Sequence, residues 1–321
     1  MMKRIYIGTL LVIGITLAGC GGVPSQSQED AIAPLKDKKP EVALIMKSLA
    51  NEFFKTMEDG ARAHQADHAD TYTLVAEGIK DELDVNRQVQ LVEQMVARGV
   101  DAIVIAPADS KALVSVCKRA QDKGVVVVNI DNKLDADVLA DQDMKVPFVG
   151  PDNRAGAKKV GDYLATQLQA GDAVAIVEGV PSAFNAIQRK LGLEDAMKEA
   201  GMTIVTSQSA GWEQAKANDV VAAMVTSHPE LKAILCANDS MAQGAISALR
   251  AAGKLDAIKV VGFDNISAAQ ALLKEGALLA TADQHAADLA VFGIEYALEM
   301  LKGGAQPADQ ETPVDLVTAA P

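Results

Sequence analysis

Short apolar runs alternate with longer amphipathic stretches from residue 41 almost to the end of this 321-residue chain. The apolar runs consist almost continuously of Val, Ile, Leu and Ala, which is typical of strands buried on both faces of a parallel sheet. The stretches between them have helical period, so the pattern predicts βαβ units with helices on both faces of the sheets. We expect strands at Val42–Met46, Tyr72–Ala76, Ala102–Ile105, Val125–Ile130, Val146–Val149, Ala173–Val177, Thr203–Thr206, Ala233–Cys236, Lys259–Phe263 and Leu278–Thr281. Helices are expected at Val85–Arg98, Ser110–Lys123, Arg154–Gln169, Gln214–Ser227, Met241–Ala252 and Gln284–Leu301.

These strands are too many for one comfortable open sheet, and the sequence contains no short-period repeat. The predicted fold class is therefore α/β, with two doubly wound parallel-sheet lobes and a crossing between them near Pro151–Asn153. In such sheets ligands bind outside the carboxyl ends of the strands. The residues that directly follow each strand are therefore the first candidates for a functional site.

Composition excludes several classes of partner. The chain has 30 Lys and Arg against 43 Asp and Glu, which gives a net charge of −13. Such a surface repels nucleic acid and anionic lipid, so neither is expected as a partner.

Three cysteines are too few for a dense disulfide scaffold. Cys117, on an apolar helical face, and Cys236, at the end of an apolar strand, are expected to be small buried hydrophobic residues, with a bridge between them as the alternative.

The N-terminus has the pattern of an export signal. Lys3 and Arg4 precede an apolar run over residues 5–18, which is shorter than a transmembrane helix but suits a signal-peptide core. The small residues before Cys20 resemble the lipobox of bacterial lipoproteins. We therefore expect a signal peptide over residues 1–19 and a lipidated tether over residues 20–40, with acylation at Cys20. The alternative is an ordinary signal peptide with an incidental cysteine.

Amides, carboxylates and aromatic rings gather just after the predicted strands. They are Lys47, Asn51, Phe53, Phe54, Asp131 and Asn132 in the first half, and Trp212, Asn238, Asp264 and Gln284 in the second. This chemistry suits a polyhydroxylated ligand, because each hydroxyl both donates and accepts hydrogen bonds and the C–H faces of a sugar pack against rings.

Each of these residues also has a structural alternative. Asp239 and Asn265 are at least as suited to capping helices as to binding a ligand, and Asn238 and Asp264 could be caps of the same kind. Two adjacent Phe residues are more often part of a core than of a binding platform.

Motifs of catalysis are missing from the sequence: it has no phosphate-binding loop, no Gly-x-Ser-x-Gly elbow and no His-Glu-x-x-His. His64 and His68 lie one helical turn apart without a third ligand in sight, so we expect no metal site there. His285 adjoins Gln284 and is the one histidine expected near a pocket. Neither catalytic activity nor a cofactor is therefore expected.

Several segments closely resemble the periplasmic sugar-binding proteins of the ribose- and allose-binding family. They are residues 42–54 (VALIMKSLANEFF), 105–110 (IAPADS), 127–133 (VVNIDNK), 236–244 (CANDSMAQG), 260–264 (VVGFD) and 280–284 (ATADQ). The similarity runs in order over residues 41–318. It implies a type I periplasmic binding fold, in which a three-segment hinge joins two lobes that close on a sugar for delivery to an ABC permease. The lobe boundaries implied are 41–151 (N-terminal lobe), 152–283 (C-terminal lobe), 284–312 (a segment returning to the first lobe) and 313–321 (a C-terminal tail).

Carried over residue by residue, the resemblance assigns ligand contacts to both lobes. The N-terminal lobe would supply Asn51, Phe53, Phe54 and Asp131, and the C-terminal lobe Arg189, Trp212, Asn238 and Asp264, with Gln284 at a hinge crossing. Arg189 would bind hydroxyl groups with both arms of its guanidinium. From the sequence pattern alone, Arg189 would be an exposed charge on a helix.

Three positions separate this chain from the ribose binders. Asn132 stands where they carry Arg, and Ala106 where they carry Asn, whereas Lys47 resembles the allose-type proteins. An allose-like hexose, another pentose or a sugar alcohol is therefore expected at least as much as ribose.

We expect a monomeric solute-binding lipoprotein, held outside the cytoplasmic membrane in the periplasm or cell envelope by its lipid anchor, that delivers a monosaccharide or sugar alcohol to an ABC importer. One alternative is a receptor that passes the closed form to a chemoreceptor or sensor kinase. A second is an exported enzyme that uses Asp131 and Asp264. A repressor with the same lobes is disfavoured, because an export signal stands where its DNA-binding motif would lie.

Overall fold

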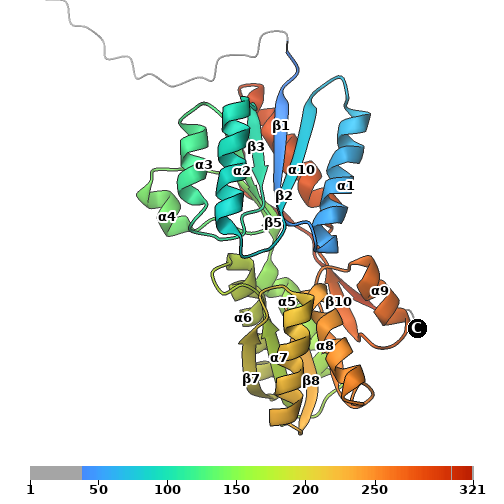
Figure 1. The fold of residues 1–321 in the computed structure, drawn as a ribbon. Helices are drawn as coiled ribbons and strands as arrows, with labels where there is room; N and C mark the ends of the chain where they lie inside the picture. The colour runs from blue at the N-terminus through green and yellow to red at the C-terminus, as the bar shows by residue number, and fades with distance from the viewer. Residues whose placement is uncertain (1–37, 305, 320–321) are drawn as a thin grey trace, which may run out of the picture. The chain divides into compact units, whose positions relative to one another are not determined.

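Two six-stranded sheets, each covered by helices on both faces, make up the folded part of the chain (Figure 1). The computed structural model describes residues 38–304 and 306–319, which all belong to one unit. The predicted signal peptide, Cys20 and most of the tether lie outside the described residues. Within the described part, none of the helices combines the length and the apolar character needed to cross a membrane.

The N-terminal lobe contains the first sheet, in the order β11-β5-β4-β3-β1-β2, with all its strands parallel. Its elements are β1 (Glu41–Ser48), α1 (Glu52–Asp67), β2 (Thr73–Ile79), α2 (Val85–Arg98), β3 (Ala102–Ile105), α3 (Val114–Gln121), β4 (Val126–Ile130), α4 (Ala136–Asp141), β5 (Phe148–Pro151), α10 (Ala286–Leu301) and β11 (Gln310–Thr312).

The C-terminal lobe contains the second sheet, in the order β12-β10-β9-β8-β6-β7, in which only β12 is antiparallel to its neighbour. Its elements are α5 (Asn153–Ala165), β6 (Ala173–Glu178), α6 (Phe184–Glu199), β7 (Thr203–Ser209), α7 (Gln214–Ser227), β8 (Leu231–Cys236), α8 (Asp239–Ala251), β9 (Lys259–Val261), α9 (Ser267–Lys274), β10 (Ala280–Asp283) and β12 (Asp315–Thr318).

Burial on both faces explains the near-continuous apolar strands. In β1, Leu44 packs with Met57 of α1 on one face of the sheet, and Ile45 packs with Leu91 of α2 on the other. All four side chains are essentially inaccessible to solvent. The same two-sided covering, by α5 and α6 on one face and by α7 and α8 on the other, forms the core of the second lobe. The predicted fold class is thus confirmed.

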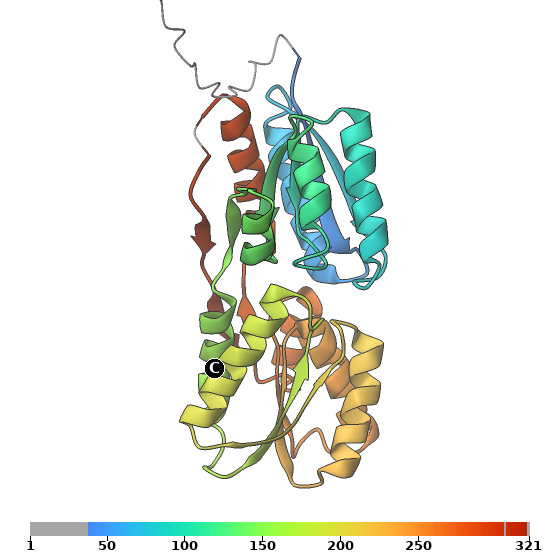
Figure 2. The same cartoon turned by 90° about the vertical axis from the view of Figure 1, so that its left-hand side faces the viewer.

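The chain passes between the two sheets three times. β5 leads into α5 at Pro151–Asn153, β10 leads into α10 after Asp283, and β11 leads into β12 after Thr312 (Figure 2). In both sheets the first strand of the lobe lies between its second and third strands, so the order reverses beside β1 and beside β6. The carboxyl ends of strands at such reversals are where doubly wound folds bind ligands.

Part of the tail expected over residues 313–321 forms a strand of the C-terminal lobe. Asp315–Thr318 forms strand β12, which pairs with β10 in the register Ala280↔Thr318 to Asp283↔Asp315. Strand β11, with only three residues, was likewise not predicted. Both are short edge strands with partly exposed side chains, so neither has the apolar run that identifies a buried strand.

Candidate functional site

A small cavity lies where the strand ends of the two lobes meet. Its walls enclose about 230 Å³ of space free of protein atoms, part of it open to solvent. They are formed by Lys47, Asn51, Phe53, Phe54, Glu82, Asp131, Asn185, Arg189, Trp212, Asn238, Asp264 and Gln284. Every predicted ligand-binding residue except Asn132 is in this set. The structure therefore brings the predicted set together, and their contact with a ligand stays a prediction.

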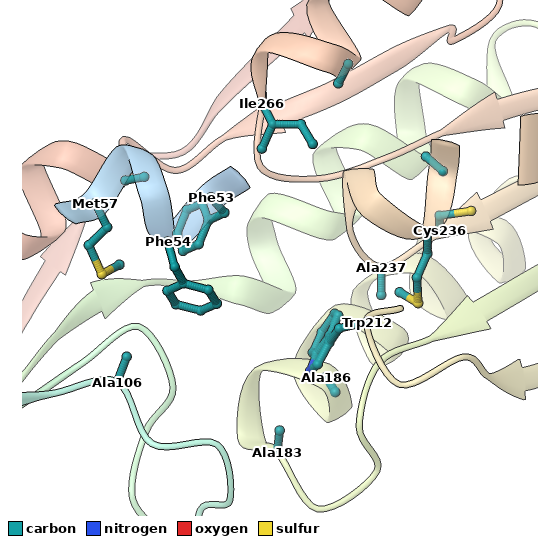
Figure 3. Close-up of a cluster of buried hydrophobic side chains, with 14 of the residues drawn as sticks. Phe53, Phe54, Met57, Ala106, Ala183, Ala186, Trp212, Cys236, Ala237 and Ile266 are labelled. Atoms are coloured by element: carbon teal, nitrogen blue, oxygen red, sulfur yellow. The ribbon is translucent and has the colours of Figure 1, made fainter. Parts of the chain in front are cut away.

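The aromatic walls come from both lobes. Phe53 and Phe54 lie in the first turn of α1, with their ring centroids 5.1 Å apart and their planes at 80°. Trp212 lies in the other lobe, in the loop after β7 (Figure 3). All three rings are almost completely buried and belong to the apolar core as well as to the cavity wall, and their contact with a ligand stays a prediction.

Trp212 occupies a position prepared for it by the backbone. Its own φ is 71°, in the left-handed region that non-glycine residues seldom adopt. A Cβ at Gly179 would lie 2.2 Å from the indole ring, so only glycine leaves room for the ring at this place. This arrangement fixes the indole as one wall of the cavity.

A buried polar network fills the C-terminal side of the cavity. Arg189 Nη1 lies 3.2 Å from Asp264 Oδ1 and donates to the carbonyl oxygen of Ala237 at 3.0 Å. Its Nε donates to Asn153 Oδ1 at 2.7 Å, and Gln284 Nε2 donates to Asp264 Oδ1 at 2.7 Å.

The guanidinium carbon of Arg189 also lies 3.8 Å from the centroid of the Phe263 ring. The side chain of Arg189 is only 3% exposed, so the expectation from the sequence pattern of an exposed helix charge is wrong. The residue is buried because α6 turns this position toward the cavity and its charged partner.

On the N-terminal side, Lys47 and Asp131 form a second buried ion pair. Lys47 Nζ lies 3.0 Å from Asp131 Oδ2, and both side chains are buried. The same ammonium group lies 5.7 Å from the centroid of Phe54 and 5.9 Å from that of Trp212. The two lobes thus each present a cation, a carboxylate and an aromatic ring to the cavity.

Burial changes the titration of two cavity carboxylates. It raises the pKa of Asp264 above its usual range, although the positive charge of Arg189 acts in the opposite direction. Burial also raises the pKa of Glu82 to about 7, and Lys47 again opposes the shift. Burial away from water is therefore the largest cause of both shifts.

Several buried polar atoms of the cavity have no hydrogen-bond partner among the described residues. They are Glu82 Oε2, Asp131 Oδ2, Asn185 Oδ1, Trp212 Nε1 and Gln284 Oε1, of which Asp131 Oδ2 has the ammonium group of Lys47 beside it. A buried polar atom without a partner costs about 1–3 kcal/mol. A ligand with several hydroxyl groups can donate to the oxygens and accept from the indole N–H at the same time.

Two cavity residues also cap helices. Asn51 Oδ1 accepts from the backbone N–H of Phe53 at the start of α1, and Asn238 Oδ1 accepts from that of Met241 at the start of α8. Asp239 serves the fold instead, because its carboxylate accepts from Thr281 Oγ1 and from the backbone N–H of Ile266.

Asn132 is the one predicted ligand-binding residue that does not line the cavity. It is completely buried, and its Nδ2 donates to the carbonyl oxygen of Pro107 at 2.8 Å. The preceding residue, Asp131, has a φ of 60°, and the N–H of Asn132 bonds back to the carbonyl of Ile130. This tight turn sends the side chains of two adjacent residues to different places.

Asn132 instead takes part in contacts between the lobes. Its Oδ1 accepts from the backbone N–H of Asn185, and Ser110 Oγ accepts from that of Phe184, at the start of α6. Glu52 in the same way accepts from the N–H of Ser267 at the start of α9. Neither α6 nor α9 has a side-chain cap from its own lobe, so the N-terminal lobe caps both.

Sequence reasoning missed Glu82 and Asn185. Glu82 lies three residues beyond β2, so a wider search after each strand would have included it. Asn185 lies in the first turn of α6, four residues before Arg189, and nothing in the sequence pattern distinguishes it from a surface amide.

Other candidate groups lie outside the cavity. His285 lines a neighbouring pocket, and its Nε2 lies 3.0 Å from Asp315 Oδ2. Cys117 and Cys236 are buried free thiols, so the alternative of a bridge between them is wrong. Within residues 38–304 and 306–319, no three His, Cys, Asp or Glu side chains are placed to hold a metal ion.

Fold and cavity together define a two-lobed binding protein for a small polar solute. A family model described as "Periplasmic binding protein domain" matches residues 42–305, and the chain belongs to this family. It is 55% identical to the D-ribose/D-allose-binding protein of Pseudomonas aeruginosa, over 99% of this chain and 100% of that protein.

Solved structures agree with this assignment. A solute-binding protein of an ABC transporter from Burkholderia multivorans, solved with an unknown ligand represented as alpha-D-erythrofuranose, is 58% identical with a TM-score of 0.86, over 88% of this chain and all of that one. A periplasmic solute-binding protein from Actinobacillus succinogenes with bound D-allose is 34% identical with a TM-score of 0.83, over 88% of this chain and 98% of that one. The family expected from the sequence motifs is therefore confirmed.

Proposed function

We propose that this protein captures one monosaccharide molecule between its two lobes and delivers it to an ABC importer. The observation that carries the proposal is the cavity itself, which has aromatic walls on both sides and buried polar atoms without partners in the described chain. D-Allose and D-ribose are the first candidate ligands, since relatives are named for them. Sugar alcohols fit the same hydrogen-bonding requirement.

Closure of the lobes is the proposed mechanism. Asp131 and Lys47 belong to one lobe and Asp264 and Arg189 to the other, so a sugar that contacts both pairs favours the closed form. The walls are too nearly closed for a sugar to enter without movement, because all of their charged side chains are buried. Binding selects the hydroxyl pattern, since a missing hydroxyl leaves a buried group unpaired.

Titration calorimetry with D-allose, D-ribose and sugar alcohols tests the proposal, together with the fluorescence of Trp212, the only tryptophan. At 100 times its Kd, a ligand stabilises the fold by about 2.7 kcal/mol, which a thermal melt detects. Binding of one of these ligands, with a change in Trp212 emission, supports the proposal. An absence of binding across the panel contradicts it, and release of a changed sugar would favour the enzyme alternative.

We further propose that the protein lies in the periplasm, as its family indicates, and that a lipid on Cys20 anchors it to a membrane. Cys20→Ser is expected to move the protein from the membrane fraction to the soluble periplasmic fraction, because the acyl chains are the anchor. Mass spectrometry of the mature N-terminus measures the acylation directly. Equal membrane association of the two proteins would contradict the anchor.

A further inference from the structure

Glu82 is a buried carboxylate in the cavity wall that neither the sequence motifs nor the ion pairs account for. It is only 3% exposed, and its Oε2 has no hydrogen-bond partner among the described residues. Asp131 Oδ2 also has no hydrogen-bond partner, but both other cavity carboxylates have a cation beside them, since Asp131 has Lys47 at 3.0 Å and Asp264 has Arg189 at 3.2 Å. Burial of a carboxylate without a partner is expensive, so its retention in the wall requires an explanation.

The surroundings of Glu82 do not supply that partner. The charged groups that act on it are Lys47 of β1, Asp131 after β4, Glu213 at the start of α7 and its own neighbour Asp81. Lys47 is the one cation among them, and it is already engaged with Asp131. A hydroxyl group of the ligand is therefore the group that can donate the missing hydrogen bond to Glu82 Oε2.

Glu82 also lies where the cavity meets a second, larger pocket. This outer pocket shares Asn51, Glu82 and Trp212 with the cavity. It encloses about 1130 Å³ of space free of protein atoms, against about 230 Å³ for the cavity. A ligand group that reaches Glu82 therefore points toward the outer pocket.

We propose that Glu82 is a specificity-determining residue that accepts a hydrogen bond from the ligand hydroxyl nearest the outer pocket. This inference rests on the proposed function. Glu82 then discriminates against sugars that lack this one hydroxyl group. A hydrogen bond to an ionised group contributes about 1.5–3 kcal/mol, so loss of that hydroxyl is expected to weaken binding at least tenfold.

The test combines ligand analogues with protein variants. The Kd of D-allose, D-ribose and the monodeoxy analogues of whichever sugar binds is measured for the wild type, Glu82→Ala and Glu82→Gln. Glu213→Gln is the matched control, since Glu213 lines the outer pocket but not the cavity. Thermal melts establish that each variant is folded.

One deoxy analogue is expected to bind the wild type and Glu213→Gln at least tenfold more weakly than the parent sugar. In Glu82→Ala the same analogue should bind within about threefold of the parent, because the acceptor of that hydroxyl is gone. In addition, the wild type should release protons on binding near pH 7, since a donated hydrogen bond favours the ionised carboxylate, and Glu82→Gln should release fewer.

An unchanged penalty for every deoxy analogue in Glu82→Ala overturns the assignment of Glu82, and so does equal proton release by the wild type and Glu82→Gln. A wild type that binds neither these sugars nor the sugar alcohols of the panel contradicts the proposed function itself, so the two failures are distinguishable.

Discussion

Replacing Glu52 with alanine is expected to weaken sugar binding about fivefold, although Glu52 does not line the cavity. Glu52 is the first residue of α1, in the N-terminal lobe. Its carboxylate accepts from the N–H of Ser267 at 3.0 Å and from that of Ala268 at 3.4 Å, and it also contacts the hydroxyl of Ser267. These groups form the start of α9 in the other lobe, so the bonds exist only where the lobes meet.

The magnitude follows from the chemistry of helix capping. Loss of a side-chain cap costs about 1 kcal/mol, and a negative charge at a helix N-terminus contributes a further fraction that salt screens. Because Ser267 is exposed to solvent, we take the lower figure. If the free protein is mainly open and the ligand-bound form is closed, a loss of about 1 kcal/mol from closure appears in full as about a fivefold increase in Kd.

Calorimetry and stopped-flow fluorescence of Trp212 measure this effect. The dissociation rate should rise for Glu52→Ala, and Glu52→Gln should lie between it and the wild type, because glutamine keeps an acceptor but not the charge. Glu58→Ala is the control, since Glu58 bonds to Arg62 of its own helix and not to the other lobe. A Kd for Glu52→Ala within twofold of the wild type would refute the view that trans-lobe capping stabilises the closed form.

Three further predictions concern the cavity. Asp264→Ala should abolish detectable sugar binding in calorimetry and lower the free energy of unfolding by roughly 3–5 kcal/mol, since it leaves the buried charge of Arg189 without its carboxylate; retained affinity would contradict the site. Burial raises the pKa of Glu82 to about 7, so the folded chain keeps this proton where the unfolded chain has released it, and Glu82 destabilises the fold increasingly as pH rises from about 4.5 to above 7. The free energy of unfolding of Glu82→Gln relative to the wild type, measured by urea denaturation, should therefore be higher at pH 8 than at pH 5, by at most about 3 kcal/mol. An equal difference between the two proteins at both pH values would contradict this titration. Gly179→Ala should shift the emission of Trp212, lower stability by about 1–3 kcal/mol and weaken binding, because the added Cβ would overlap the indole ring; an unchanged spectrum and Kd would show that the ring is not confined as described.

The strands that could be predicted from the sequence are those buried on both faces of a sheet. Strands covered on both faces, such as β1 and β8, consist of almost uninterrupted apolar residues and are found from composition alone. The edge strands β11 and β12 are three and four residues long and partly exposed, so they lack that pattern. Their place became visible only through pairing with β5 and β10, which is a property of the folded chain.

Site residues could be predicted from the sequence where they directly follow a strand, because the carboxyl ends of parallel strands lie at the same edge of a sheet. This rule located Asn51, Asp131 and Asp264. It did not separate Asp131 from Asn132, because a positive φ at a non-glycine residue leaves no reliable mark in a sequence. Arg189 could be found only through the family resemblance, since one charge in a helical pattern reads as exposed.

The polar network of the C-terminal lobe connects the cavity to the places where the chain crosses between the sheets. Arg189 bonds to Asn153, the first residue of α5 after the first crossing, and Asp264 accepts from Gln284, the residue directly after β10 at the second. Under the proposed function, a sugar held by Arg189 and Asp264 would therefore act on their partners Asn153 and Gln284, which belong to two of the three crossings. Binding and the conformation of the crossings share hydrogen bonds, so any change in the backbone at Asn153 or Gln284 alters the geometry that the ligand meets.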